Sequence, residues 1–289
     1  MKPVRKAIFP VAGFGTRFLP ATKAVPKEML PVVDRPLIQY AVDEARAAGI
    51  EQMIFVTGRN KYAIEDYFDS ALEVEHDLSV KNKTAMFEMM QKTRLAAGKA
   101  AFVRQQQMLG LGHAVGCARD LVGDEPFAVL LPDELLWNPG SPCLRQMAQT
   151  YEAKGGNVIA VVEVPEDHTH RYGIVDPGTT EGPVTEVKRM IEKPAAGTAP
   201  SRLACVGRYI LQPEIFDLLD KGERGAGGEI QLTDAMAKLI GVQPFHALTF
   251  DGDRHDCGDN AGFIQANIAL ALERPEIADS IRAFIKNLD

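Results

Sequence analysis

The sequence contains no long hydrophobic run and only four cysteines, and both facts exclude classes of protein. No apolar segment approaches the ~20 residues that cross a bilayer, which predicts a chain with no membrane partner. The N-terminal stretch MKPVRKAIFPVAGFG is too short for a signal peptide, and no small-residue cleavage site follows it. Cys117, Cys143, Cys205 and Cys257 form no C-x-x-C pair, which disfavours a disulfide framework or a zinc cage. We therefore predict a cytoplasmic location and reduced thiols.

Acidic side chains outnumber basic ones in the chain as a whole. There are 32 Lys and Arg against 39 Asp and Glu, a formal net charge of −7, which argues against a nucleic-acid partner. Residues 1–35 depart from this balance, with seven basic and two acidic side chains. A local positive site on an acidic body is typical of a protein that binds a small anionic ligand. The alternative is that these basic side chains are scattered and solvated.

The sequence also lacks the common catalytic and phosphate-binding motifs. No G-x-S-x-G string and no readable Cys–His arrangement occurs, so the nucleophile of a hydrolase is not evident. The dinucleotide fingerprint G-x-G-x-x-G fails because Phe18 takes the third glycine position, which argues against an NAD(P)-dependent dehydrogenase. The NTPase string G-x-x-x-x-G-K-[ST] is absent.

A glycine-containing basic loop remains after an apolar run near the N-terminus. Gly13 and Gly15 let backbone N–H groups approach phosphate oxygens. Arg17, Lys23 and Lys27 lie in the same loop. Several positive charges beside accessible backbone amides are better suited to a triphosphate than to the less highly charged diphosphate bridge of a dinucleotide. The alternative is a tight turn whose charged side chains are solvated.

The order of apolar segments predicts an α/β fold. Strand-like segments lie near residues 6–12, 51–58, 100–105, 126–134, 156–164, 172–176, 184–194 and 204–211. Helical segments alternate with the first five of these strands and include one long charged stretch over 71–97. This alternation predicts a mixed, mostly parallel central sheet with helices on both faces. We expect one domain over 1–289, with a nucleotide-binding half (1–165) and a substrate-binding half (166–289).

Three chemically rich loops follow predicted strands. The glycine loop follows the first strand, RQQQMLGLGH follows the third, and LPDE follows the fourth. Ligands of such sheets bind outside the carboxyl ends of the strands, so we expect these loops to share one site. Asp133 of LPDE is a candidate Mg²⁺ ligand, because Mg²⁺ takes one or two carboxylates together with substrate phosphates. Asp256 of RHDCG is the candidate second carboxylate; a helix cap and a surface loop are the respective alternatives.

An ordered set of motifs covers almost the whole chain. These are G-x-G-T-R, PKEMLP, RQQQMLGLGHAV, LPDE, YGIV, EKP, VGRYIL, GGEIQLTDA and HDCG. The set resembles the signature of the sugar-1-phosphate nucleotidyltransferases. The stretch ATKAVPKEMLPVVDRPLIQY together with HDCG is most similar to the uridylyltransferase branch of that family. The resemblance implies a Rossmann-like nucleotidyltransferase fold.

The resemblance also implies a set of site residues. It places the nucleotide on Ala12, Gly13, Gly15, Thr16, Arg17, Lys27, Gln105, Gly110 and Asp133. It assigns sugar binding to Tyr172, Gly173, Glu192, Lys193, Val206 and Glu229, with Lys193 on the sugar phosphate. It makes Asp133 and Asp256 the Mg²⁺ ligands. The catalytic charges that it implies are Arg17, Lys27 and Lys193.

The implied reaction is uridylyl transfer from UTP to glucose 1-phosphate, with Mg²⁺ as cofactor and UDP-glucose and pyrophosphate as products. The attacking phosphate oxygen is already anionic, so the reaction needs alignment and charge neutralisation but no general base. Members of such a family usually self-associate, which predicts a homo-oligomer, dimer or tetramer. Two alternatives stay open: the same chemistry with dTTP or CTP, and a non-catalytic regulatory relative that binds a nucleotide sugar.

Overall fold

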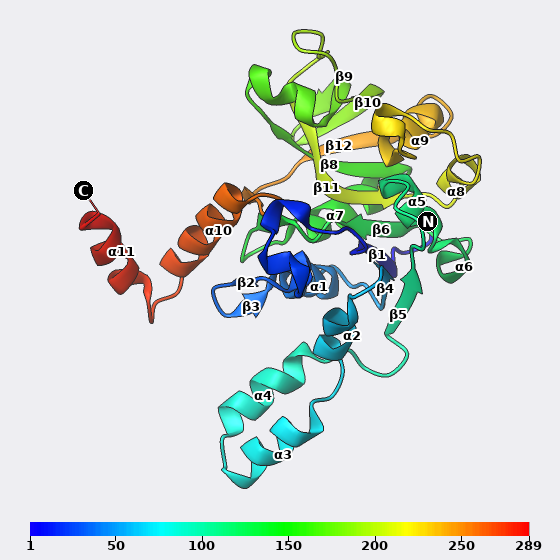
Figure 1. The fold of residues 1–289 in the computed structure, drawn as a ribbon. Helices are drawn as coiled ribbons and strands as arrows, with labels where there is room; N and C mark the ends of the chain where they lie inside the picture. Colours follow the sequence, from blue (N-terminus) through cyan, green and yellow to red (C-terminus); the bar gives the residue numbers. More distant parts are fainter. Residues whose placement is uncertain (289) are drawn as a thin grey trace.

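Strand and helix segments alternate from residue 6 to residue 163, as the hydrophobic pattern predicts. The computed structural model describes residues 1–288 (Figure 1). The main sheet of this part has nine strands in the spatial order β5-β4-β1-β6-β11-β8-β12-β10-β9. In chain order these strands are β1 (Lys6–Pro10), β4 (Gln52–Thr57), β5 (Ala100–Arg104), β6 (Phe127–Leu130), β8 (Asn157–Glu163), β9 (Gly173–Glu181), β10 (Val184–Glu192), β11 (Leu203–Leu211) and β12 (Phe245–Thr249).

Two short antiparallel pairs lie outside the main sheet. They consist of β2 (Pro31–Val32) with β3 (Arg35–Pro36), and of β7 (Glu134–Trp137) with β13 (Asp253–Asp256). In the main sheet, β5, β4, β1 and β6 pair in parallel, as do β8 and β12. The remaining neighbours are antiparallel because β10 and β11 run against the other seven strands. The predicted mixed, mostly parallel sheet is therefore confirmed, whereas the division into two halves stays a prediction.

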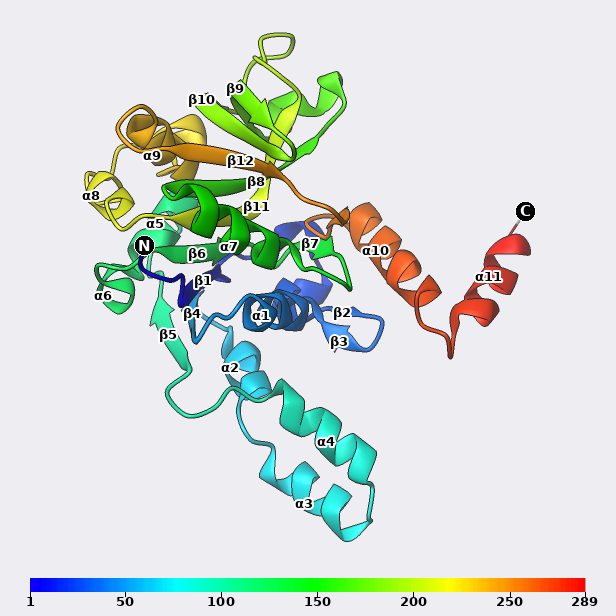
Figure 2. The ribbon, with the colours of Figure 1, turned by 180° about the vertical axis from the view of Figure 1, so that it is seen from behind.

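Helices cover both faces of the sheet, as predicted. They are α1 (Leu37–Ala47), α2 (Tyr62–Phe68), α3 (Leu72–Val80), α4 (Thr84–Thr93), α5 (Leu111–Gly116), α6 (Arg119–Val122), α7 (Cys143–Lys154), α8 (Ile215–Leu219), α9 (Leu232–Leu239), α10 (Asn260–Leu272) and α11 (Ala278–Lys286). Alternate side chains of β1 point to opposite faces, so Ile8 belongs to the core cluster that includes α5 and α9, while Ala7 and Phe9 belong to the cluster that includes α1 and α7. These helices lie on opposite faces of the sheet (Figures 1 and 2). None of the helices within residues 1–288 has the length and apolar character needed to span a membrane.

Three sequence-based expectations need correction. The helix predicted over 71–97 is two helices, because the backbone turns between α3 and α4, where Asn82 has a φ of 55°. The strand predicted over 126–134 ends at Leu130, which leaves Asp133 in the turn before β7. The strands β12 and β13 were not predicted, because their pairing partners β8 and β7 lie far away in the sequence.

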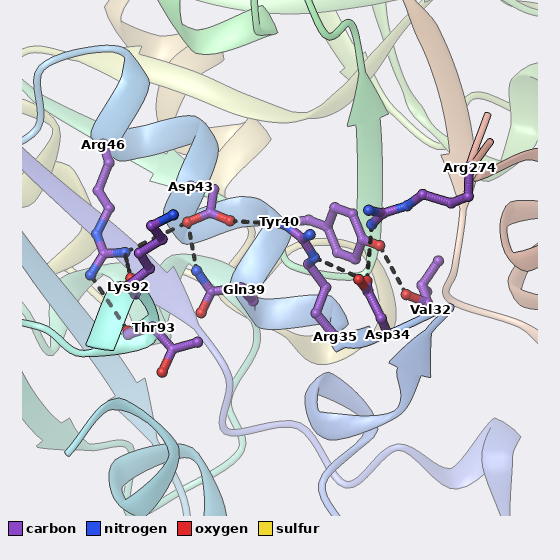
Figure 3. A network of polar contacts seen from close by, with 10 residues as sticks. All are labelled: Val32, Asp34, Arg35, Gln39, Tyr40, Asp43, Arg46, Lys92, Thr93 and Arg274. Carbon is purple, nitrogen blue, oxygen red and sulfur yellow. Dashed lines mark hydrogen bonds and ion pairs between the residues drawn. The ribbon is translucent and has the colours of Figure 1, made fainter. Parts of the chain in front are cut away.

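Charged side chains fix two peripheral elements, the α3–α4 hairpin and the α10–α11 arm (Figure 3). Arg46 of α1 donates to the carbonyl oxygen of Lys92 in α4 at 2.8 Å. Arg274, between α10 and α11, donates to Asp34 at 2.9 Å, and Asp34 also accepts from Arg35. Both elements project away from the sheet in the two views (Figures 1 and 2). The contact of Arg46 holds the C-terminal end of α4, and the contact of Arg274 holds the turn between α10 and α11.

Candidate active site

The three loops predicted to share a site follow β1, β5 and β6. These strands run in the same direction within one parallel group, so their carboxyl ends meet at the same edge of the sheet. The loop after β1 forms three short 3₁₀ turns at Thr16–Phe18, Ala21–Lys23 and Lys27–Met29. No long helix starts there, which agrees with the failure of the dinucleotide fingerprint.

A pocket of about 320 Å³ lies between the loops after β1 and β5. It is lined by four residues of the predicted nucleotide set, Ala12, Gly13, Gln105 and Gly110. Glu229 lines the same pocket, although the resemblance assigned it to the sugar. Gly110 has a φ of 106°, and a Cβ there would lie 2.7 Å from the Cβ of Glu229. Glycine is therefore required at 110, and the close packing fixes Glu229 beside the nucleotide residues. The assignment of Glu229 to the sugar stays a prediction.

The Gln105 amide is oriented by its neighbours. Its Nε2 donates to the carbonyl oxygen of Gly110 at 3.1 Å and lies 3.0 Å from Nδ1 of His113. A carbonyl oxygen can only accept, so the NH₂ group must face Gly110. The donor half of the Gln105 amide is thus engaged within the protein in this structure, and the carbonyl half remains.

A cluster of opposite charges lies beside this pocket at the same edge of the sheet. Nζ of Lys27 is 2.6 Å from Oδ2 of Asp133. Burial alone would lower the pKa of Lys27, but the carboxylates of Asp133 and Glu28 outweigh burial and raise that pKa. Burial would raise the pKa of Asp133, but the Lys27 ammonium outweighs it and holds that pKa below its usual value. Both side chains are therefore charged at neutral pH.

Arg17 and the second predicted carboxylate converge on the same place, marked by Gly258. A Cβ at Gly258 would lie 2.9 Å from Oδ1 of Asp256, 3.6 Å from Oδ2 of Asp133 and 3.6 Å from Nη1 of Arg17. The backbone N–H of Gly258 donates to Oδ1 of Asp256 at 3.0 Å, which fixes that carboxylate. The side chains of Thr16 and Arg17 are exposed at the first 3₁₀ turn. Asp133, Asp256 and Arg17, which are far apart in the sequence, thus meet at one point.

The two carboxylates fit the donor set of a divalent metal. A divalent metal is what the resemblance of the sequence motifs implies. Within residues 1–288, no three or more His, Cys, Asp or Glu side chains are grouped so that they could hold a metal on their own. A pair of carboxylates that leaves the other positions to phosphate oxygens and water is the arrangement that Mg²⁺ favours. Asp133 and Asp256 therefore fit a metal shared with a phosphate substrate.

Four of the predicted sugar residues lie on or next to the neighbouring strands β9 and β10, whose register pairs Gly173 with Glu192. A Cβ at Gly173 would lie 3.1 Å from Oε2 of Glu192, so glycine at this position leaves room for the carboxylate. Lys193 is a non-glycine residue with a φ of 46°, and its N–H donates to the carbonyl oxygen of Tyr172 at 3.0 Å. Such strained backbone is concentrated at functional sites. The structure thus brings Tyr172, Gly173, Glu192 and Lys193 together.

Val206 is the one predicted sugar residue whose side chain cannot reach a ligand in this structure. Its side chain is fully buried in the core between the sheet and α1. The assignment of Val206 to the sugar can therefore refer only to its main chain. The β11 backbone is irregular there, with a register shift against β8 between Cys205 and Tyr209.

Two arginines near the site were not predicted from the sequence. Arg254 of β13 makes a two-point contact with Glu134, and burial raises the pKa of Glu134 to about 7 even though Arg254 opposes that rise. Arg208 is buried and binds Glu44 of α1. The sequence did offer one signal, since Arg208 is a lone charge within the apolar run of VGRYIL and a buried charge must be paired.

A third unpredicted pair lies beneath the basic loop. Glu28 of PKEMLP is buried and accepts from Nζ of Lys61 at 2.7 Å. Burial raises the pKa of Glu28, although the nearby ammonium groups of Lys61 and Lys27 oppose that rise. The pair connects the loop after β1 to the start of α2 and so fixes the backbone next to Lys27.

Comparison with known proteins gives full-length relatives. The chain is 51% identical over 290 residues to the UTP–glucose-1-phosphate uridylyltransferase of Staphylococcus epidermidis (strain RP62A), which covers 100% of both chains. It is 52% identical over 288 residues to the protein of the same name in Bacillus subtilis (strain 168), covering 100% of this chain and 98% of the relative.

Solved structures agree with these relatives. A UDP-glucose pyrophosphorylase complexed with UDP-glucose has a TM-score of 0.84 and 43% identity, over 94% of this chain and 100% of the other. A UTP-bound UGPase from Acinetobacter baumannii has a TM-score of 0.91 and 42% identity, over 99% of this chain and 100% of the other. The family model described as "Nucleotidyl transferase" matches residues 6–273. The resemblance seen in the sequence motifs is thus confirmed, and the chain belongs to the nucleotidyl transferase family.

Proposed function

We propose that this chain transfers the uridylyl group of UTP to glucose 1-phosphate and is a UTP–glucose-1-phosphate uridylyltransferase. A phosphate oxygen of glucose 1-phosphate forms a bond to the α-phosphorus of UTP. The bond from that phosphorus to the bridging oxygen breaks, and pyrophosphate leaves. The convergence of Asp133, Asp256 and Arg17 at one point carries the chemistry. The choice of substrates is supported by the names of the full-length relatives.

Each part of the site has a defined task in this reaction. Arg17 and Lys27 neutralise the phosphate chain of UTP and the departing pyrophosphate. Lys193 holds the sugar phosphate, and Glu192 accepts from sugar hydroxyls. Asp133 and Asp256 are the residues that would hold Mg²⁺, which when bound supplies further neutralisation of phosphate charge. In this structure the Lys27 ammonium forms an ion pair with Asp133, so its positive charge lies beside the residues proposed to bind the phosphates.

The amide of Gln105 favours uracil over cytosine. The free carbonyl of this amide can accept the N3–H of uracil, whereas N3 of cytosine is itself an acceptor. CTP is therefore disfavoured, while thymine, which keeps the N3–H, must be excluded by its methyl group. A non-catalytic relative is disfavoured because the chain retains Asp133, Asp256 and Lys193.

A matrix of nucleotides and sugar phosphates tests the proposed function. UTP, dTTP and CTP are each assayed with glucose 1-phosphate and with other hexose 1-phosphates, with Mg²⁺ and with EDTA. We expect UTP with glucose 1-phosphate to give the highest kcat/KM, CTP to be poorer by about 10²-fold, and EDTA to abolish turnover. Equal use of dTTP and UTP, or no turnover with any pair, would contradict the proposal.

We also propose that the chain forms a homo-oligomer through the α10–α11 arm. This arm projects from the body (Figures 1 and 2), and α11 packs on α10. Four large apolar side chains of the arm are exposed, namely Ile264 (58%), Ile268 (40%), Phe284 (62%) and Ile285 (38%). Several exposed apolar side chains on two packed helices are typical of an interface, and a second copy of the chain is the commonest partner. The cytoplasmic location predicted from the sequence stays a prediction.

Light scattering during size-exclusion chromatography tests the oligomer. We expect the mass of the unchanged chain to be two or four times that of one chain, and Phe284→Glu to reduce it. The matched control is Val242→Glu, which adds the same charge at another exposed apolar residue (79% exposed), distant from the arm. The proposal is wrong if the unchanged chain runs as a monomer, or if Phe284→Glu leaves the mass as it is.

A further inference from the structure

Arg254 connects the two paired strands beside the proposed metal ligands. It lies on β13, two residues before Asp256, and β13 pairs with β7, which begins directly after Asp133. Its Nε and Nη2 donate to the two carboxylate oxygens of Glu134 at 2.7 and 2.8 Å. The same Nη2 lies 3.5 Å from Oδ2 of Asp256. The guanidinium of Arg254 is thus fixed by contacts from both strands.

The other face of Arg254 contacts the sugar loop. Its guanidinium carbon lies 5.1 Å from the centroid of the Tyr172 ring, and the nearest nitrogen is 3.4 Å from the Tyr172 hydroxyl. The carbonyl oxygen of Tyr172 accepts the N–H of Lys193 at 3.0 Å, and Gly173 follows directly in the chain. Tyr172 is therefore held between Arg254 and the strained backbone of Lys193.

We propose that Arg254 is a positioning residue that couples the metal-binding carboxylates to the sugar-binding loop through Tyr172. This inference rests on the proposed function, because it concerns how the metal-binding and sugar-binding parts of that site are held relative to each other. The side chain of Arg254 is 14% exposed, so little solvent competes with its contacts. A planar guanidinium suits this task, because its edge forms the fork to Glu134 while its face packs on an aromatic ring.

The coupling has a kinetic consequence for one substrate. If Arg254 is lost, Tyr172 loses the support that sets its ring and the adjacent Gly173 in place. The nucleotide pocket at Gln105 and Gly110 lies on other loops and keeps its contacts. Misplacing a positioning group by about 1 Å can cost ~10²-fold in rate. We therefore expect the loss to fall on the sugar phosphate and not on UTP.

The test is steady-state kinetics with Arg254→Met, in which UTP and glucose 1-phosphate are varied separately. We expect the KM for glucose 1-phosphate to rise about ten-fold or more and kcat to fall, with the KM for UTP changed by less than about two-fold. Arg254→Lys keeps the charge but loses the fork, so it should recover only part of the loss. An equal rise in both KM values would overturn the inference, because it would indicate a general structural effect.

A double-mutant cycle tests whether the effect passes through Tyr172. If the effect of Arg254 passes through Tyr172, the double variant Arg254→Met/Tyr172→Leu should have a KM for glucose 1-phosphate no higher than that of the more affected single variant. Additive increases would overturn the proposed route. If Arg254→Met does not fold, Glu134→Leu/Arg254→Met leaves no buried carboxylate unpaired and carries the same measurement. Arg119→Met, which removes an exposed arginine of α6, is the control that should change neither KM.

Calorimetry separates this inference from the proposed function. Turnover of UTP and glucose 1-phosphate by the unchanged chain tests the function itself. Binding of UDP-glucose and of UTP, measured without turnover, tests Arg254. We expect Arg254→Met to weaken UDP-glucose about ten-fold and to leave UTP within about two-fold. Equal losses for the two ligands, or a loss for neither, would overturn the inference whatever the turnover of the unchanged chain.

Discussion

Replacing Asp133 with asparagine is expected to lower kcat by at least ~10²–10³-fold, the usual effect of removing one preorganised charge from such a site. Asp133 has two tasks in the structure. It is one of two carboxylates that fit a shared metal, and it accepts from Lys27 at 2.6 Å. Asparagine is nearly isosteric but neutral, so it weakens both tasks without opening a cavity. The measurement is kcat with saturating UTP, glucose 1-phosphate and Mg²⁺.

The fold of the variant is checked by its thermal midpoint, because Asp133→Asn also leaves Lys27 without its carboxylate. Asp217→Asn is the matched control, since Asp217 is an exposed carboxylate that binds Arg119 far from the site. We expect the control to retain full turnover, because exposed ion pairs contribute about 0–1 kcal/mol. A folded Asp133→Asn protein with near-normal turnover would exclude Asp133 from the reaction.

The sequence predicted the part of the fold that depends on local patterns. Apolar runs of strand length between helical segments predicted β1, β4, β5, β6 and β8, and parallel strands must bring their following loops to one edge. What local patterns do not encode is pairing between distant segments. The strand β13 carries Asp256 to the site only because it pairs with β7, more than a hundred residues earlier.

The same limit applies within the site. The backbone N–H of Ile230 donates to the carbonyl oxygen of Leu109 at 2.7 Å, which holds Glu229 next to the loop after β5, a neighbour that the motif order did not indicate. Arg254 lies next to a motif, yet its partners Glu134 and Tyr172 are remote in the sequence. Motifs predicted the candidate ligand-binding residues, whereas the residues that contact and position those candidates were visible only in three dimensions.

The buried pair of Glu44 and Arg208 is the positioning contact on which stability should depend most. Arg208 is 1% exposed, and its Nε and Nη2 lie 3.0 and 2.9 Å from Oε2 of Glu44. It also donates to the carbonyl oxygens of Leu131 and Glu134, at 2.8 Å each, and so holds the turn that carries Asp133. The other oxygen of Glu44 accepts the N–H of Leu144 at the start of α7. One ion pair thus connects α1, α7, β11 and the turn that carries Asp133.

Arg208→Met is expected to lower the free energy of unfolding by about 3–5 kcal/mol, because it leaves the Glu44 carboxylate buried and uncompensated. Urea unfolding measures this loss, with Arg119→Met as the exposed control, which should cost less than about 1 kcal/mol. Glu44→Gln/Arg208→Met removes both charges and keeps an acceptor for Leu144, so it should recover at least about 2 kcal/mol of the loss. A double variant no more stable than the single one would show that the carbonyl contacts of Arg208, and not its charge pair, hold the turn.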